Sequence, residues 1–242
     1  MKRLIILSHY DRDNVLDPYV IKVVKALRDY SSKFVFVTTS KLDSWEIDSL
    51  KSCKIDVIER ENVGFDFMSY KVGVLQSNLQ DYDEVILCND SLYGPLRPLD
   101  KFFEEMEKRE CDFWGLTDNH DHAYHLQSHW LAVRRKVIDS GKFIEFVKNI
   151  EPKDKGTTIQ LYEIGFTQFM LKCGFKSSVF AFVSGFMQNQ AWYKWKELLE
   201  EYNMPFIKAR WVESPLMYEV LLKETDYDLH MLKSNLKRVK RK

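Results

Sequence analysis

The stretch that decides the fold of this chain is Glu84-Val85-Ile86-Leu87-Cys88-Asn89-Asp90-Ser91-Leu92-Tyr93-Gly94-Pro95. Four consecutive apolar residues, Val85 to Cys88, predict a strand buried on both faces, as in the middle of a parallel sheet covered by helices. Three small oxygen-bearing side chains follow at once, and Gly94-Pro95 then turns the backbone. Because open α/β sheets bind ligands at the carboxyl ends of their central strands, we expect a ligand site at Asn89, Asp90 and Ser91.

Asp90 has two interpretations at this point. A carboxylate flanked by Asn and Ser suits a hard divalent cation, Mg²⁺ or Mn²⁺, that keeps several waters and binds a diphosphate. Alternatively, Asp90 begins an Asx-turn and Ser91 caps a helix, which would be a purely structural role. The residues alone leave both interpretations open.

Composition restricts the class of protein. A chain of 242 residues with 45% hydrophobic residues can bury one substantial core, which predicts one domain with a small appendage. Lys plus Arg and Asp plus Glu number 36 each, so no overall charge favours nucleic acid.

The four cysteines lack Cys-x-x-Cys spacing and are expected to be reduced core thiols. The apolar run after Met1-Lys2-Arg3 is too short for a signal peptide, and no later run could span a bilayer, so we expect a cytoplasmic protein.

Strands alternate with helices along the chain, and this order predicts a mostly parallel sheet with right-handed crossovers. The expected strands are residues 4–7, 34–38, 55–59, 85–88, 113–116, 130–133 and 176–182. Asp17 and Pro18 predict the start of the first helix as N-cap and first helical residue. Later helices are expected over residues 44–50, 66–79, 100–108, 136–150 and 157–174, with Thr157 or Thr158 as the cap of the last, and again from residue 190 onward.

The segment Glu61-Asn62-Val63-Gly64-Phe65-Asp66 lies between an expected strand and the next helix. Free backbone N–H groups at the start of a helix make such a loop suitable for an anion or a nucleotide-sugar. The alternative is that Asp66 is only an N-cap and Gly64 only a turn residue.

Four of the six histidines lie between residues 120 and 129. A metal site is one interpretation, although no cysteine accompanies them and their spacing matches no helical His-x-x-x-His pair with a glutamate between the two histidines. Contacts with sugar hydroxyls are a second interpretation, and ordinary surface or core histidines are a third.

Five ordered motifs resemble those of the rhamnan synthesis protein F family of bacterial glycosyltransferases. They are Glu61-Asn62-x-Gly64-x-Asp66, Asn89-Asp90-Ser91-x-x-Gly94-Pro95, Phe113-Trp114-Gly115-Leu116-Thr117, His125-Leu126-Gln127-Ser128 and Glu163-Ile164-Gly165-Phe166-Thr167. The resemblance covers most of residues 1 to about 210 and implies a GT-A type, Rossmann-like fold. It also implies a nucleotide-sugar donor, such as dTDP-rhamnose, and a role in building a cell-surface polysaccharide.

The resemblance also implies roles for individual residues. Glu163 would be the base that takes the acceptor proton in an inverting transfer, its alternative being an ordinary glutamate on a helix surface. Asp90 would bind the metal, but Asn89 stands where such enzymes usually carry a first carboxylate, so the metal requirement stays open. The donor would be bound by Glu61, Asn62, Gly64, Asp66, Asn89 and Ser91. The acceptor sugar would be bound by Asp118, His125, Gln127 and Ser128.

The chain divides, in this interpretation, into a GT-A-like catalytic domain at residues 1–185 and a helical extension at 186–242. Leu229, Leu232 and Leu236 predict a short helix that ends in a basic segment, formed by Lys233, Lys237, Arg238, Lys240, Arg241 and Lys242. Such a segment could contact an anionic membrane from its cytoplasmic face, where lipid-linked acceptors lie. The alternative is that these cations only complement the helix dipole and keep the chain soluble.

Two further functions compete with a transferase. One is a non-catalytic carbohydrate-binding or scaffold subunit on a degenerate transferase fold, which Asn89 and the small size suggest. The other is a nucleotidyltransferase that makes the activated sugar, which is disfavoured because no Gly-rich, Lys- or Arg-bearing phosphate loop follows the first strand.

Overall fold

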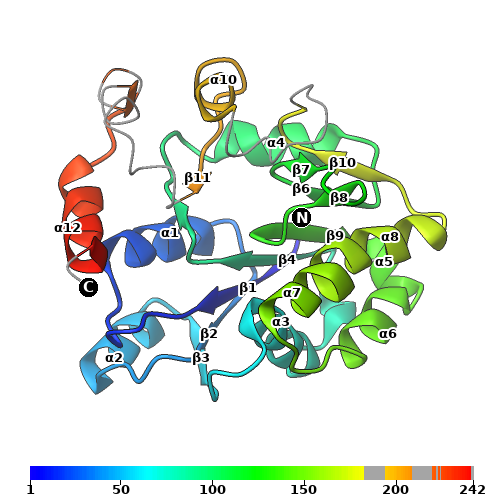
Figure 1. Ribbon diagram of the computed structural model, residues 1–242, viewed down its shortest axis with the longest axis horizontal. Helices are drawn as coiled ribbons and strands as arrows, with labels where there is room; N and C mark the ends of the chain where they lie inside the picture. Colours follow the sequence, from blue (N-terminus) through cyan, green and yellow to red (C-terminus); the bar gives the residue numbers. More distant parts are fainter. Residues whose placement is uncertain (183–193, 209–219, 222, 224, 241–242) are drawn as a thin grey trace.

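The computed structural model describes residues 1–182, 194–208 and 220–240 except 222 and 224, and it contains a seven-stranded sheet (Figure 1). Across the sheet the strands are β10 (Ser177–Val179), β6 (Phe113–Gly115), β9 (Trp130–Arg134), β4 (Glu84–Asn89), β1 (Arg3–His9), β2 (Lys33–Thr38) and β3 (Asp56–Glu59). All neighbours run parallel except β9, which is antiparallel to both β4 and β6. The predicted mostly parallel α/β sheet, with residues 85–88 at its centre, is confirmed.

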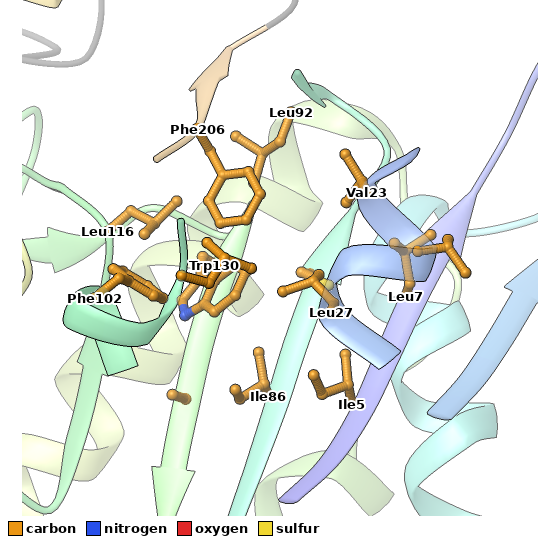
Figure 2. Close-up of a cluster of buried hydrophobic side chains, with 14 of the residues drawn as sticks. Ile5, Leu7, Val23, Leu27, Ile86, Leu92, Phe102, Leu116, Trp130 and Phe206 are labelled. Atoms are coloured by element: carbon orange, nitrogen blue, oxygen red, sulfur yellow. The ribbon is translucent and has the colours of Figure 1, made fainter. Parts of the chain in front are cut away.

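Helices cover both faces of the sheet. Successive side chains of a strand point to opposite faces, so the strand residues that a helix contacts show which face it covers. One face packs on α1 (Pro18–Arg28), α2 (Ser44–Ser52) and α4 (Asp100–Lys108). The other packs on α3 (Phe65–Leu75), α5 (Arg135–Asp139), α6 (Lys142–Lys148) and α8 (Gly165–Lys172). Figure 2 shows Ile5 and Leu7 of β1 beneath Val23 and Leu27 of α1. Residues 85–88 are buried on both sides, as a central strand requires.

The amino end of β4 carries a buried ion pair. Glu84 is 1% exposed and accepts hydrogen bonds from Arg3 Nε at 2.8 Å and from Trp114 Nε1 at 2.8 Å. An uncompensated carboxylate at such depth would cost several kcal/mol. The bonds therefore hold β1, β4 and β6 in one register at the end of the sheet opposite the candidate site.

Some helix boundaries follow the sequence and others do not. Asp17 and Pro18 begin α1 as predicted. The predicted helix over residues 136–150 is two helices, because Gly141 adopts a positive φ of 73° between α5 and α6. The predicted cap at Thr157 or Thr158 is wrong: Asp154 accepts from the Thr157 N–H at 3.0 Å and caps α7 (Lys155–Thr158).

The carboxyl-terminal part of the chain packs on the sheet and adds a strand that the sequence did not predict. It contains α10 (Trp195–Glu200), β11 (Ile207–Lys208) and α12 (Leu229–Lys240), and β11 pairs antiparallel with β5 (Leu92–Tyr93). A strand of two residues has no periodicity by which the sequence could reveal it. The predicted boundary between residues 185 and 186 lies outside the described residues.

Ion pairs attach α12 to the loop after β1, and Figure 1 shows α12 beside α1. The Arg238 guanidinium contacts the carboxylates of Asp11, Asp13 and Asp17, with an N–O distance of 2.9 Å to Asp13. Asn235 also donates to Asp17. Arg238 of the predicted basic tail is therefore used inside the fold, and Arg241 and Lys242 lie outside the described residues.

No helix in the described parts of the chain is both long enough and apolar enough to cross a membrane.

A substitution at Gly73 tests how closely α3 approaches the sheet. A Cβ at this position would lie 2.5 Å from Ile6 Cγ2. We expect Gly73→Ala to lower the free energy of unfolding by about 1–3 kcal/mol, since overpacking outweighs the gain of ~1 kcal/mol in helix propensity. Urea unfolding measures the change.

Gly165→Ala is the matched control, because its Cβ would lie 3.4 Å from the nearest heavy atom, the Gln160 carbonyl oxygen. A Gly73→Ala protein as stable as the Gly165→Ala protein would contradict the close approach.

Candidate functional site

The site lies at the carboxyl ends of the central strands and is organised by Asp66. The Ser8 hydroxyl donates to Asp66 Oδ1 at 2.8 Å, and the Asn89 amide donates to Asp66 Oδ2 at 2.8 Å. Asp66 lies in the first turn of α3, whereas Ser8 and Asn89 lie in β1 and β4. These two bonds therefore join one helix to the ends of two strands. Asp66 is not the N-cap, which is Gly64.

Asn89 has a linking role that the sequence did not reveal. Its Oδ1 accepts from the Ser91 N–H at 3.2 Å and from the Ser91 hydroxyl. The Asx-turn at this edge is therefore made by Asn89 and not by Asp90. Ser91 caps no helix, because β5 follows it directly. Direct donor contacts of Asn89 and Ser91 stay predictions.

Asp90 lies beside Asp66 in a partly buried position. Its Oδ2 accepts from the Tyr10 N–H at 2.8 Å, and its backbone carbonyl accepts from the Tyr19 hydroxyl at 3.0 Å. Burial raises the pKa of the Asp90 carboxyl well above its usual range, and the neighbouring Asp66 raises it further. Burial also raises the pKa of Asp66, against the hydrogen bonds from Ser8 and Asn89. Two such carboxyls attract a positive charge.

The predicted metal site can be tested against these contacts. Asn89 Oδ1 is turned toward Ser91, and both oxygens of Asp66 already accept hydrogen bonds. Over the described ranges, no group of three or more His, Cys, Asp or Glu side chains could hold a metal ion. The side chains present therefore do not fit a metal site built by the protein. Asp90 is the remaining predicted ligand.

The loop before α3 is shaped by Arg60, which the sequence analysis missed. Its guanidinium donates to the carbonyl oxygens of Glu61 and Val63 at 2.7 Å and of Phe65 at 2.6 Å. These bonds accompany positive φ angles at Gly64 (74°) and Phe65 (56°), a conformation that glycine adopts readily and phenylalanine rarely. The loop is thus held in a strained shape, as binding loops often are.

Glu61 and Asn62 lie at a groove beyond this loop, as a donor-binding role would require. The groove has a volume of about 610 Å³ and runs over the ends of β2 and β3. Its lining residues are Thr39, Ser40, Lys41, Glu59, Arg60, Glu61 and Asn62.

Glu163 lies in a π-helical segment, Ile159–Ile164, between α7 and α8. Such segments are rare and are often found at functional sites. Its carboxylate accepts from the Ser128 hydroxyl, and its Oε1 lies 3.6 Å from His125 Nε2. Burial would raise the pKa of Glu163, but the neighbouring His125 and the hydrogen bond from Ser128 outweigh it and lower the pKa to about 2. The side chain is 20% exposed, so it is not a solvated surface glutamate.

His125 lies in the hairpin formed by β7 (Asp118–Asn119) and β8 (His125–Leu126). Its Nδ1 is 2.8 Å from the Ala123 carbonyl oxygen. Because a carbonyl oxygen only accepts, Nδ1 carries a proton, and Nε2 is the atom that faces Glu163. His125 is 2% exposed, so its structural role is to orient the glutamate.

The other predicted acceptor residues are also held by the protein. Gln127 is 3% exposed and accepts from the Thr117 hydroxyl at 2.7 Å. Asp118 is buried, and burial raises the pKa of its carboxyl. Ser128 is half-buried and donates to Glu163. Sugar contacts by these residues stay predictions.

α3 links the part of the site around Asp66 and Asp90 to the part around Glu163. One turn after Asp66, the Tyr70 hydroxyl donates to the Ser128 carbonyl oxygen at 2.9 Å. The sequence analysis did not single out Tyr70, because a buried tyrosine and a positioning tyrosine have the same sequence pattern.

Lys208 is a second residue that the sequence did not indicate. It lies in β11, next to the strand that follows Asp90. After the larger effects of burial and hydrogen bonds, its charge lowers the pKa of both Asp66 and Glu163. It also helps burial to lower the pKa of His129 to about 3. The ammonium is therefore close to both sides of the site.

Three solved structures are similar to this chain. The glycosyltransferase GlyE of Streptococcus pneumoniae TIGR4 matches over 98% of this chain and 64% of its own, with 13% identity and a TM-score of 0.45. S. aureus TarS 1–349 in complex with UDP matches over 58% of this chain and 49% of its own, with 13% identity and a TM-score of 0.42. The inositol-1-phosphate CTP transferase of T. maritima matches over 74% and 84%, with 12% identity and a TM-score of 0.43.

Sequence comparison gives a family. The virulence protein VirA of Vibrio anguillarum is 27% identical over 185 residues, which are 74% of this chain and 59% of that protein. The uncharacterized protein y4gN of Sinorhizobium fredii is 28% identical over 133 residues, 52% of this chain and 35% of that protein. The chain thus spans less than two thirds of either relative. The sequence model of rhamnan synthesis protein F matches residues 34–242. The chain therefore belongs to the rhamnan synthesis protein F family.

Proposed function

We propose that this chain is a glycosyltransferase that moves a sugar from a nucleotide-sugar to an acceptor hydroxyl with inversion at the anomeric carbon. The observation that carries the proposal is the arrangement around Glu163, a carboxylate oriented by His125 and Ser128. Across α3 from it, Asp66 and Asp90 lie at the carboxyl edge of the sheet. Family membership supports this function and favours rhamnose, carried as dTDP-rhamnose, as the sugar.

The transfer makes one bond and breaks another. The acceptor oxygen attacks the anomeric carbon, and the bond from that carbon to the diphosphate oxygen breaks with its electron pair going to the diphosphate. The acceptor proton passes to Glu163 as general base. A carboxyl with a pKa of about 2 is ionised at neutral pH but is a weak base. To give up its proton there, the acceptor hydroxyl would have to displace the Ser128 hydroxyl from the Glu163 carboxylate.

The donor would lie along the edge from the groove at Glu61 and Asn62 to Asp90. The predicted Mg²⁺ or Mn²⁺ would offset charge on the diphosphate when bound. Since the side chains do not build a metal site, most of its ligands would have to be donor oxygens and water.

A non-catalytic carbohydrate-binding or scaffold subunit is the second candidate function. The inward-turned amide of Asn89 favours it, because this residue cannot act as the usual acidic metal ligand while it holds Ser91. Release of nucleoside diphosphate from nucleotide-sugars, measured with and without a glycan acceptor, separates the two functions. A thermal-shift screen of nucleotide-sugars selects the donor, because a ligand that binds the native state stabilises it.

The acceptor would be a glycan, and we propose that it is carried on a lipid at the cytoplasmic face of a membrane. Lys233 and Lys237 are exposed on α12 and could contact anionic lipids there. Arg238 is not available for this contact, because it binds Asp11, Asp13 and Asp17.

Asp90→Asn tests the donor side. The amide oxygen can still accept from the Tyr10 N–H, so the fold should persist. Loss of the carboxylate should lower kcat/KM by about two orders of magnitude or more, because Asp90 is the predicted ligand of the cation that would offset charge on the diphosphate. The exposed Asp48→Asn on α2 serves as control. Turnover close to that of the unaltered protein, in folded Asp90→Asn protein, would refute the assignment.

Glu163→Gln tests the base. Transfer should fall by about two orders of magnitude or more, while donor affinity stays within about twofold, because the base contacts the acceptor and not the nucleotide. Equilibrium binding of the donor and initial rates measure the two quantities. The exposed Glu104→Gln on α4 is the control.

If donor affinity collapses in Glu163→Gln and turnover stays high, Glu163 belongs to the donor side. The base would then have to be sought among Asp118, Asp121 and His125.

Vesicle binding tests the membrane contact. Lys233→Gln with Lys237→Gln should weaken binding to anionic vesicles by roughly 30-fold, since each basic residue contributes about 1 kcal/mol. Co-sedimentation measures it, and Lys101→Gln with Lys108→Gln on α4 is the control pair. Truncation of α12 is unsuitable, because it would also remove Asn235 and Arg238 from their ion pairs and hydrogen bonds. Binding that ignores both the substitution and added salt would exclude this role.

A further inference from the structure

Asp66 and Asp90 lie at the carboxyl edge of the sheet, with Glu163 across α3 from them, and a leaving diphosphate would bring negative charge to this edge. Such a site needs a cation, which in proteins is a metal ion, an arginine or a lysine. The side chains present do not build a metal site in the described part of the chain. A basic side chain at this edge could supply the positive charge without a metal.

Two arginines at this edge are already used by the fold. Arg60 donates to three backbone carbonyls and to the Ser69 hydroxyl, which fixes the loop before α3. Arg238 binds the carboxylates of Asp11, Asp13 and Asp17. Both guanidinium groups therefore hold loops in place around this edge.

Lys208 is placed at this edge by backbone pairing. In the ladder between β11 and β5, Lys208 lies opposite Leu92, two positions after Asp90. On its other side it borders Thr117 and His129, where β6 and β9 approach the site. His129 directly follows Ser128, the residue that donates to Glu163. Lys208 thus lies between the strand that follows Asp90 and the segment that contacts Glu163.

The backbone around Lys208 is held firmly. Phe206 packs over Trp130, as Figure 2 shows. Their ring centroids are 5.5 Å apart. The Leu96 N–H donates to the Pro205 carbonyl oxygen at 2.8 Å. Gly94 makes this close approach possible, since a Cβ there would lie 2.5 Å from Phe206 Cδ1 and 2.6 Å from the Pro205 oxygen. A charge on such a support needs little reorganisation when negative charge develops.

We propose that Lys208 supplies the positive charge that stabilises the departing diphosphate, so that transfer does not require a divalent cation. The proposal rests on the proposed transferase function and names the residue that would assist its leaving group. When the bond from the anomeric carbon breaks, the electron pair stays on the diphosphate oxygen, and the ammonium offsets that charge without giving up a proton. The small space beside Lys208 and His129, about 10 Å³, holds one water at most, so the diphosphate would meet the ammonium on the donor side.

Binding of inorganic pyrophosphate to the full chain in EDTA tests the proposal by calorimetry. The unaltered protein should bind pyrophosphate without metal. Lys208→Met, which keeps the length but removes the charge, should bind at least 10-fold more weakly. Lys208→Arg should stay within about threefold, because a guanidinium also binds phosphate oxygens. Lys108→Met, at an exposed position on α4, should not change the affinity.

Several outcomes would overturn the proposal. One is pyrophosphate binding that is undetectable in EDTA and appears only with Mg²⁺ or Mn²⁺. Another is a folded Lys208→Met protein that binds as well as the unaltered chain. A merely structural lysine would lower the thermal unfolding temperature in Lys208→Met without changing the affinity for pyrophosphate. If Lys208→Met does not fold, the unaltered protein and Lys208→Arg in EDTA still decide whether binding needs metal.

The same variants separate this inference from the proposed function. Charge-dependent pyrophosphate binding with no transfer from any nucleotide-sugar would refute the transferase and leave an anion site at Lys208. Transfer that persists equally in Lys208→Met and in EDTA would refute the role of Lys208 and leave the transferase.

Discussion

The hydrogen bonds that Asp66 accepts from Ser8 and Asn89 are the constraint on which the rest of the site depends. Apolar packing presses α3 against the sheet but has no direction of its own, so it does not fix where the helix begins. Two directed bonds to the ends of β1 and β4 fix that point. Tyr70, one turn later, then holds Ser128, and Ser128 donates to Glu163. The same helix therefore positions the edge at Asp66 and, through Ser128, the proposed base Glu163.

A carboxyl group lies at each end of β4, and the two groups have different surroundings. Glu84 at the amino end is paired with Arg3 and bonded to Trp114, which suits a structural role. Asp90, just beyond the carboxyl end, lies beside another carboxyl and has a raised pKa because of burial. Carboxyl groups that have a strongly shifted pKa and no guanidinium close by are often found at functional sites. Glu163 shows the opposite shift, caused by the neighbouring His125 and the hydrogen bond from Ser128. The roles that we propose for Asp90 at the diphosphate and for Glu163 as base rest on this difference in environment.

The carboxyl-terminal segments reach the surroundings of Asp90 at two points. β11 brings Lys208 next to the strand that follows Asp90. Arg238 of α12 forms an ion pair with Asp11. Tyr10, the residue before Asp11, donates its backbone N–H to Asp90. A change in how α12 is seated would therefore reach Asp90 through one short loop.

The sequence by itself determined the central strand, the alternation of strands and helices, the start of α1 and the position of Asp90 at the sheet edge. Each of these is a local pattern of apolar spacing or capping, which a chain carries regardless of its neighbours. Only the tertiary structure decided that β9 runs antiparallel, that Asn89 links Asp66 to Ser91, and that Lys208 reaches this edge. Periodicity reports that a segment is buried but not which distant segment lies against it, because that choice depends on contacts between residues far apart in the chain.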